Sequence, residues 1–210
     1  MRIFDVTRPV DESLIIWRGQ MPPEILWVSN ISLGGYCNAS QLRMSVHTGT
    51  HMDAPLHFVD DGKAIHQIPF GVFIGECTVV DLRSTDILVM GEELASKYRG
   101  VKRLLIRTNH SYSGNGQLYE PHDRLITPAA TTLLVDSGLV LIGTDRLSVD
   151  DSRGDDFSLH HQLLEAGCVI LEGLLLKDVE PKRYFLYAPP LLLPGREASP
   201  VRALLMETDQ

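Results

Sequence analysis

The chain has 210 residues, of which 44% are hydrophobic and 22% are charged, and its formal net charge at pH 7 is −8. These values are typical of a globular protein folded as one domain, here residues 1–210. The acidic balance argues against nucleic-acid binding, which requires clustered Lys and Arg, and no run approaches the roughly 18 apolar residues that would span a membrane.

The N-terminus and the cysteines predict a cytoplasmic location. The opening Met-Arg-Ile-Phe-Asp contains no signal-peptide core. Cys37, Cys77 and Cys168 are widely spaced and form no CxxC pair, which is typical of reduced thiols. Cys77 and Cys168 lie in apolar runs, so we expect small buried side chains and not the nucleophiles of a cysteine hydrolase.

Strands and loops are predicted for the first part of the chain. Residues 2–6 alternate as a short strand, and residues 26–31 and 40–46 are strand-like, the last with the alternation of a half-buried strand. The loop after the first strand contains Trp17, which follows an apolar trio and precedes a glycine turn. Trp17 is either a core or lid aromatic, or a flat wall for an aromatic substrate.

The next stretch, residues 47–57, contains three of the eight histidines and one aspartate. These residues are His47, His51, Asp53 and His57. Imidazole and carboxylate are ligands of zinc and manganese. A wholly extended chain would separate His47 from His51 by roughly 13 Å, too far for one ion, and Thr-Gly-Thr and Pro55 disfavour a helix. We therefore expect a tight turn at Gly49, and the alternative is a polar loop that is merely rich in histidine.

The middle of the chain alternates strands with short helices. The predicted strands are 76–82, 102–108 and 138–143, and the predicted helices are 91–98 and 127–136. His110 lies in a loop just past a strand end, where it could face a substrate. His66 is expected to be a surface or hydrogen-bonded side chain, and the acidic residues 150–156 a solvated loop.

The last third adds a helix and an unusual buried acid. Residues 158–167 form a helix capped by Ser158, on which one of His160 and His161 faces the core. Glu172 lies inside the apolar run Val-Ile-Leu-Glu-Gly-Leu-Leu-Leu, where an unpaired carboxylate would be costly to bury, so it needs an arginine or a cation. A loop over 184–193 and a strand over 200–206 complete an α/β fold, a mixed sheet with few short helices.

The motif His-x-Gly-Thr-His-x-Asp-x-Pro-x-His, from His47 to His57, resembles the signature of the cyclase-like metal-dependent hydrolases. That family includes bacterial kynurenine formamidases and isatin hydrolases. The resemblance covers nearly the whole chain. Its supporting pieces are an opening Asp-x-Thr-x-Pro, Trp17-x-Gly19, His160-x-x-Leu-Leu, Ile-Leu-Glu172 and Ser199-Pro-Val-Arg-Ala.

The resemblance implies a swivelling β/β/α fold and a metal site for one or two ions. His47, His51 and Asp53 would hold the first ion. Asp53 and Glu172 would bridge to a second ion completed by His160. The implied metal is zinc, with manganese as the alternative.

The resemblance also implies roles around the metal and in assembly. His57 would be the general acid/base, Trp17 would line the substrate pocket, and the protein would be a homodimer or homotetramer. Kynurenine formamidases usually carry Trp-Pro-Gly where this chain has Arg18 between Trp17 and Gly19. That departure leaves the identity of the substrate open.

The favoured hypothesis is metal-assisted hydrolysis of a non-peptide C–N bond, of the arylformamidase type, converting N-formylkynurenine to kynurenine and formate. The partner is then a small, aromatic amide, with neither nucleic acid nor membrane involved. One alternative is a cyclic amide hydrolase, such as an isatin hydrolase, using manganese. Another is a non-catalytic metal-binding protein, whose structural zinc site would be closed by four protein ligands. His57, as an additional basic group, favours an enzyme.

Overall fold

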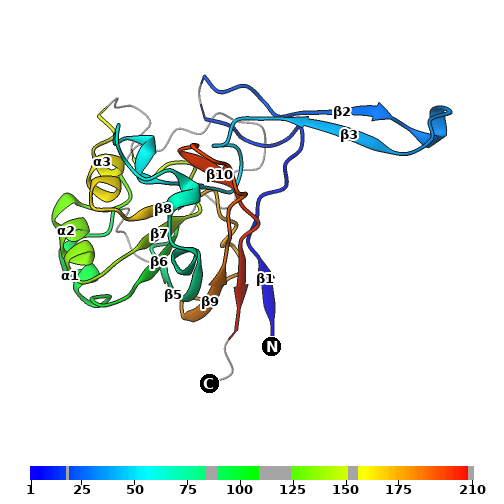
Figure 1. The fold of residues 1–210 in the computed structure, drawn as a ribbon. Coiled ribbons are helices and arrows are strands. Elements are labelled where there is room, and N and C mark those ends of the chain that lie inside the picture. The colour runs from blue at the N-terminus through cyan, green and yellow to red at the C-terminus, as the bar shows by residue number, and fades with distance from the viewer. Residues whose placement is uncertain (18, 84–88, 109–123, 151–155, 208–210) are drawn as a thin grey trace.

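The computed structural model describes residues 1–17, 19–83, 89–108, 124–150 and 156–207. Within them, nine strands form one sheet in the order β1-β11-β9-β5-β6-β7-β8-β4-β10, and β2 and β3 form a separate ribbon (Figure 1). The strands are β1 (Ile3–Asp5), β2 (Glu24–Ser29), β3 (Ala39–Arg43), β4 (His51–Asp53), β5 (Ile74–Asp81), β6 (Arg103–Arg107), β7 (Leu141–Thr144), β8 (Val169–Glu172), β9 (Arg183–Tyr187), β10 (Ala198–Pro200) and β11 (Leu204–Met206). The α-helices are α1 (Glu92–Ser96), α2 (Pro128–Asp136) and α3 (Ser158–Glu165).

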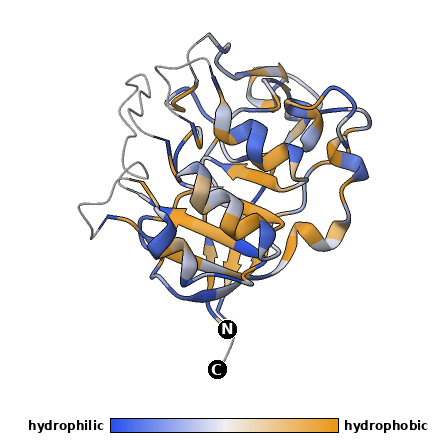
Figure 2. Ribbon diagram, turned by 90° about the vertical axis from the view of Figure 1, so that its left-hand side faces the viewer, coloured by the Kyte–Doolittle hydropathy of each residue, from blue (hydrophilic) through white to orange (hydrophobic). Residues whose placement is uncertain are grey.

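The sheet is mixed because β5, β6, β7 and β8 pair in parallel while its other strands pair antiparallel. Of the parallel strands, β6, β7 and β8 are buried along their whole length, as expected when both faces are covered. The three helices lie on one side of these strands (Figure 1), and the strands behind them are largely hydrophobic (Figure 2). A mixed sheet with few short helices is therefore confirmed.

Side chains alternate between two cores on the two faces of the sheet. Leu104 and Ile106 join the helix-side core with Ala130 and Leu163. Leu105 joins the opposite core, which also contains side chains of β4, β9 and β11. Because strands from both ends of the sheet share this second core, the sheet curls around it as a half-barrel.

The cysteines follow their predicted pattern. Cys77 and Cys168 are buried, one in each core, while Cys37 is exposed. Burial raises the pKa of both buried thiols to about 12. Neither is a thiolate near neutral pH, so the nucleophile of a cysteine hydrolase is not found among these two residues.

The predicted helices are confirmed in position, but the N-cap residue of α3 is not the one that the sequence predicted. The Thr127 hydroxyl caps α2 by accepting a hydrogen bond from the Ala130 N–H, with Pro128 in the first turn. Ser158 does not cap α3, because the N-cap residue is Phe157, at φ 39° and with no side-chain cap bond. None of the described helices is long and apolar enough to cross a membrane.

Two strand predictions are wrong in detail. The segment predicted as one strand over 200–206 divides into β10 and β11, which pair at opposite ends of the sheet, and the predicted loop over 184–193 begins with most of β9. β3 is not half-buried, because it pairs only with β2 in a ribbon that extends away from the body (Figure 1). The alternating pattern in β3 therefore has no core to face.

Candidate metal centre

The pairing of β4 with β8 brings the histidine-rich stretch to the isolated glutamate. β4 lies between β8 and β10, and in its antiparallel register with β8 His51 stands directly opposite Glu172. Asp53 is two residues after His51 and so faces the same side of the sheet. Three polar side chains from two distant parts of the sequence therefore meet on one buried face.

The turn predicted at Gly49 is present and is stabilised by a close approach to the end of β8. Gly49 has φ 68° and Gly173 has φ 70°, and a Cβ on Gly173 would lie 2.3 Å from the Gly49 carbonyl oxygen. The Thr50 hydroxyl donates to the Gly173 carbonyl at 2.7 Å. The turn returns the chain so that His47 Nδ1 lies 2.9 Å from Asp53 Oδ1.

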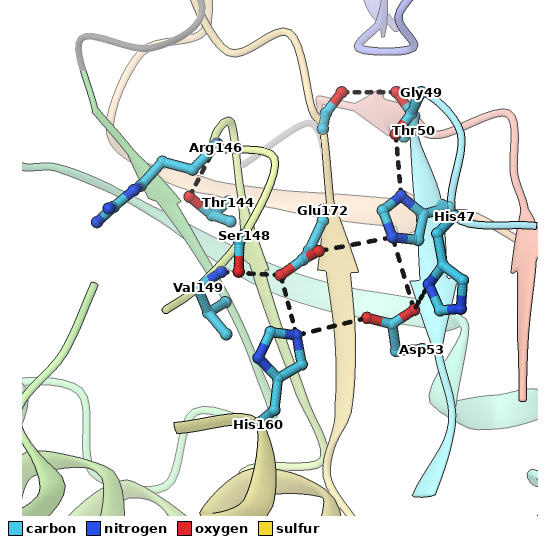
Figure 3. A network of polar contacts seen from close by, with 12 residues as sticks. His47, Gly49, Thr50, Asp53, Thr144, Arg146, Ser148, Val149, His160 and Glu172 are labelled. Atoms are coloured by element: carbon cyan, nitrogen blue, oxygen red, sulfur yellow. Dashed lines mark hydrogen bonds and ion pairs between the residues drawn. The ribbon is translucent and has the colours of Figure 1, made fainter. Parts of the chain in front are cut away.

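Two imidazoles and two carboxylates face one another across a small space (Figure 3). His51 Nε2 lies 3.6 Å from Asp53 Oδ1 and 3.5 Å from Glu172 Oε2. His160 Nε2 lies 3.8 Å from Asp53 Oδ2 and 3.5 Å from Glu172 Oε1. Ligands of a tetrahedral zinc ion, bound at about 2.0–2.1 Å, are separated by roughly 3.3 Å, so these donors have nearly the spacing of a metal shell.

Each of three histidines has an acceptor for its outer ring nitrogen, which leaves the inner nitrogen facing the carboxylates. The acceptors are the Gly49 carbonyl at 3.0 Å from His51 Nδ1, Asp150 Oδ2 at 2.7 Å from His160 Nδ1, and Glu197 Oε1 at 3.3 Å from His47 Nε2. Metal-binding histidines typically donate their second N–H to such an acceptor, which fixes the tautomer and the ring orientation.

The two central carboxylates are buried and incompletely satisfied. Asp53 is 1% exposed and Glu172 is 3% exposed. Asp53 Oδ1 contacts His47 Nδ1 at 2.9 Å, whereas Asp53 Oδ2 has no hydrogen-bond partner among the described residues. Glu172 Oε1 accepts the Val149 N–H at 2.8 Å. Such a pair is costly to bury without a cation. The unsatisfied Oδ2 of Asp53 therefore fits a bound metal ion.

The pKa values of the two carboxyl groups are shifted in opposite directions by this environment. Burial raises the pKa of Glu172 well above its usual value, and the adjacent Asp53 charge raises it further. Burial also opposes ionisation of Asp53, but the charge of His51 and the hydrogen bond and charge of His47 outweigh it and lower the pKa of Asp53. The ionised forms of Asp53 and Glu172 thus repel each other at close range, and a divalent cation between them would offset that repulsion.

His57 lies at the edge of this group, on the 3₁₀ turn Pro55–His57. Its ring centroid is 4.2 Å from that of His47 and 6.0 Å from that of His160. Burial lowers the pKa of His57 to about 4, and the neighbouring histidines add to the effect against the opposing charge of Asp53. His57 is therefore neutral near pH 7, with geometry that suits either a proton acceptor or a third ligand beside His47 and Asp53.

A cavity of about 170 Å³ opens onto the histidines and carboxylates. Trp17 lines it together with Ile15, Leu147, Phe58 and Phe157. Trp17 also packs against Ile15 and Leu147 in a small apolar cluster. This position is compatible with a lid aromatic as well as with a substrate wall, so the role of Trp17 stays a prediction. The part of the cavity lining that these residues form is apolar and aromatic.

Sequence reasoning missed two acidic residues that contact the site. Asp150, predicted as part of a solvated loop, is 2% exposed and accepts the N–H groups of Leu159 and His160 as well as His160 Nδ1. Asp156, from the same acidic run, is exposed as predicted. The apolar residues just before Asp150 were the one sequence signal of its burial, and Glu197 carried none.

The remaining histidines lie apart from the carboxylates or outside the described residues. His160 faces the core while His161 is exposed and pairs with Glu165 at 3.5 Å, as predicted for this helix. His66 is exposed and accepts the Gly195 N–H, which confirms the surface interpretation. His110 lies outside the described residues.

Comparison with protein families gives a match to the family described as "Putative cyclase" over residues 4–151. Similar proteins match over the full length. A kynurenine formamidase of Salinibacter ruber is 35% identical over 209 residues, covering 99% of this chain and 98% of the relative. A kynurenine formamidase of Bacillus cytotoxicus is 34% identical over 202 residues, covering 96% of each chain.

Solved structures of similar shape include hydrolases. A predicted metal-dependent hydrolase from Bacillus stearothermophilus has a TM-score of 0.79 and 31% identity, covering 97% of each chain. Isatin hydrolase A from Labrenzia aggregata has a TM-score of 0.85 and 26% identity, covering 99% of this chain and 94% of that one. Both matches cover nearly the whole of this chain.

Proposed function

The chain belongs to the cyclase family of hydrolases, and from this membership we propose that it is a cytoplasmic, metal-dependent amidohydrolase that converts N-formylkynurenine to kynurenine and formate. The observation that carries the proposal is the buried donor set around Asp53, whose Oδ2 lacks a hydrogen-bond partner among the described residues. Its full-length relatives are kynurenine formamidases. We include in the proposal a single domain of the swivelling β/β/α class.

The donor set fits a borderline divalent ion. We assign His47, His51 and Asp53 to a first ion, and Asp53, Glu172 and His160 to a second where two are bound. Imidazole with carboxylate suits zinc or manganese, with zinc favoured. When bound, such an ion supplies Lewis acidity and lowers the pKa of a coordinated water towards about 7.

His57 is assigned the proton transfer. Its ring is neutral near pH 7 because burial lowers its pKa to about 4, so a ring nitrogen is free to accept a proton from the attacking water. The same nitrogen then returns the proton to the leaving amine nitrogen. His57 stands beside His47 at the cavity edge, which places the proton acceptor next to the space a substrate would fill.

The cavity supports a small aromatic amide as the substrate. Its volume of about 170 Å³ and its aromatic lining by Trp17, Phe58 and Phe157 suit a small planar substrate and not a folded peptide. The apolar wall would orient the aromatic ring, while the polar end would hold the amide carbonyl. An arylformamide meets both requirements.

Hydrolysis of a cyclic amide is the second candidate. It is supported by the TM-score of 0.85 and the 26% identity to an isatin hydrolase. A non-catalytic metal protein is disfavoured because the donors open onto a cavity that also contains the neutral His57.

The test combines elemental analysis with an activity comparison. Protein purified without an affinity tag is expected to contain zinc or manganese and to hydrolyse N-formylkynurenine faster than isatin. The reverse preference would establish the cyclic amide alternative. A folded, active protein free of divalent ions would refute the metal-dependent mechanism altogether.

The His57→Ala variant tests whether His57 acts as the proton acceptor or as a metal ligand. We expect turnover to be lost while the metal content of the protein stays at the wild-type level. Loss of metal in parallel with turnover would make His57 a ligand and would require another proton acceptor.

A further inference from the structure

One polar side chain of the cavity has no part in the chemistry described above. Gln20 lines the same cavity as Trp17, His57 and the buried carboxylates. Its Oε1 is buried and has no hydrogen-bond partner among the described residues. A carbonyl oxygen that is buried without a donor costs folding free energy, which a donor from a bound ligand would recover. Gln20 therefore lacks a hydrogen-bond donor that an occupant of the cavity could supply.

The position of Gln20 is fixed by the backbone next to Trp17. The Gln20 N–H donates to the Trp17 carbonyl at 3.1 Å, and Gly19 between them has φ 83°. Glycine adopts a positive φ readily, so the chain turns here without strain. Trp17 is in turn held by packing against Ile15 and Leu147. The ring of Trp17 and the carboxamide of Gln20 thus belong to one turn at the cavity.

The surroundings of Gln20 indicate which donor it lacks. A carboxamide oxygen only accepts hydrogen bonds, so its partner must carry an N–H or O–H group. Among the described residues that line the cavity, none is Lys or Arg. Acidic residues flank the loop that contains Gln20: Asp11 and Glu12 precede it, Glu24 follows it, and all three line a second hollow. Negative charge at this side of the molecule favours a cation over an anion. An ammonium group satisfies both the oxygen and this charge.

An aromatic amide with an amino group in its side chain would supply that ammonium. A substrate whose ring lies against Trp17 would present a ring substituent to Gln20, because the two residues share one turn. N-formylkynurenine carries an α-amino group in addition to its scissile formamide. We propose that Gln20 is a specificity-determining residue whose Oε1 accepts a hydrogen bond from the amino group of such a substrate. The inference rests on the proposed function and narrows its substrate class to aromatic amides that carry an amine.

Two substrates that differ only in the amino group test this assignment. N-formylkynurenine carries the group, and 4-(2-formamidophenyl)-4-oxobutanoate lacks it. The wild-type chain is expected to have a kcat/KM about 10- to 100-fold higher for N-formylkynurenine, the range for one hydrogen bond to a charged group. Gln20→Met keeps the length of the side chain but has only a weak acceptor. It should bring the ratio close to one by raising KM for N-formylkynurenine alone.

Two further variants control for the replacement itself. Gln41→Met makes the same change at an exposed glutamine outside the cavity lining and should leave the ratio at its wild-type value. Gln20→Glu keeps the acceptor and adds a negative charge, so it should retain the preference for the amine. A Gln20→Glu protein that loses the preference as fully as Gln20→Met would overturn the proposal, because the contact would then come from the carboxamide N–H.

Thermal melting distinguishes substrate recognition from a structural role. Gln20→Met removes a buried oxygen that has no protein partner among the described residues, so the melting temperature should stay unchanged or rise. A lower melting temperature, together with an equal loss of kcat/KM for both substrates, would make Gln20 a structural residue and overturn the proposal.

Calorimetry with the product separates this inference from the proposed reaction. Kynurenine and its deamino analogue, 4-(2-aminophenyl)-4-oxobutanoate, can be titrated without turnover. Kynurenine should bind the wild-type protein about 10- to 100-fold more tightly than the analogue, and Gln20→Met should remove the difference. Equal affinities in the wild type would overturn the role of Gln20 and leave the hydrolysis of aromatic formamides intact. A wild-type protein that hydrolyses neither formamide would instead refute the proposed function, and this inference with it.

Discussion

Replacing Asp150 with asparagine tests whether the residue that holds His160 controls metal affinity. Asp150 is 2% exposed, and its two oxygens accept three N–H groups: Leu159 N at 3.0 Å, His160 N at 3.0 Å and His160 Nδ1 at 2.7 Å. Asparagine has nearly the same volume but only one acceptor oxygen. In either amide orientation, its NH₂ group therefore faces at least one N–H donor.

The expected magnitude follows from these three bonds. Loss of one buried hydrogen bond to a charged group costs about 1.5–3 kcal/mol of folding stability. Weakening the acceptor of a metal-binding histidine typically lowers metal affinity about 10- to 100-fold, or roughly 1.4–2.7 kcal/mol. Asp150→Asn should therefore lower both the melting temperature and the metal affinity, whereas deletion of a ligand would abolish binding.

Competition with a chelating dye measures the metal affinity, and the thermal shift on adding metal to apoprotein measures the linked stabilisation. Asp150→Glu restores the charge and should recover part of the affinity. Asp156→Asn removes an exposed carboxylate from the same acidic run and should change neither quantity. An Asp150→Asn protein that melts lower but binds metal with wild-type affinity would refute the reasoning, because Asp150 would then only stabilise helix α3.

Three further perturbations examine the site and its support. Glu172→Gln should reduce bound metal in elemental analysis and remove the thermal shift on metal addition, and a fully metallated variant would contradict its assignment as a ligand. Gly173→Ala should lower the free energy of unfolding in urea by about 2–4 kcal/mol, because its Cβ would meet a carbonyl oxygen at 2.3 Å. Gly167→Ala is the control, because Gly167 is also at positive φ but has open space around it. It should lower the free energy of unfolding by only about 1–2 kcal/mol. Asp81→Asn should lower the free energy of unfolding by about 1–2 kcal/mol at pH 7. Burial opposes ionisation of Asp81, but hydrogen bonds from two arginines outweigh it and lower the pKa of Asp81 below its value in the unfolded chain. The stability difference between wild type and variant should therefore shrink as the pH falls below about 4.

The residues that meet at the candidate metal centre were predictable where local pattern and chemistry agree. His47, His51 and Asp53 are close in sequence, and Gly49 supplies the turn that folds them together. Glu172 was detectable because a lone acid in an apolar run needs a partner. In each case, the burial or spacing of the residue already required an explanation before its neighbours in space were known.

The outer acceptors were not predictable in the same way. Asp150 belongs to an acidic run whose other described member, Asp156, is exposed, and only the three-dimensional position of α3 distinguishes the two. Glu197 reaches His47 because β10 pairs with β4. That pairing joins segments about 145 residues apart, and no periodicity in the sequence specifies it.

The strand order explains why the site is rigid although its sequence looks like a loop. β4 is only three residues long, yet it is hydrogen-bonded on both sides, to β8 and to β10. His51 and Asp53 therefore project from the sheet itself, and Glu172 projects from the adjacent strand. The sheet thus holds these donors in place, so we expect that binding of an ion would cost little conformational entropy. His57 lies beyond β4 on the 3₁₀ turn Pro55–His57, so its position depends on that turn and not on the pairing of β4 with its neighbours.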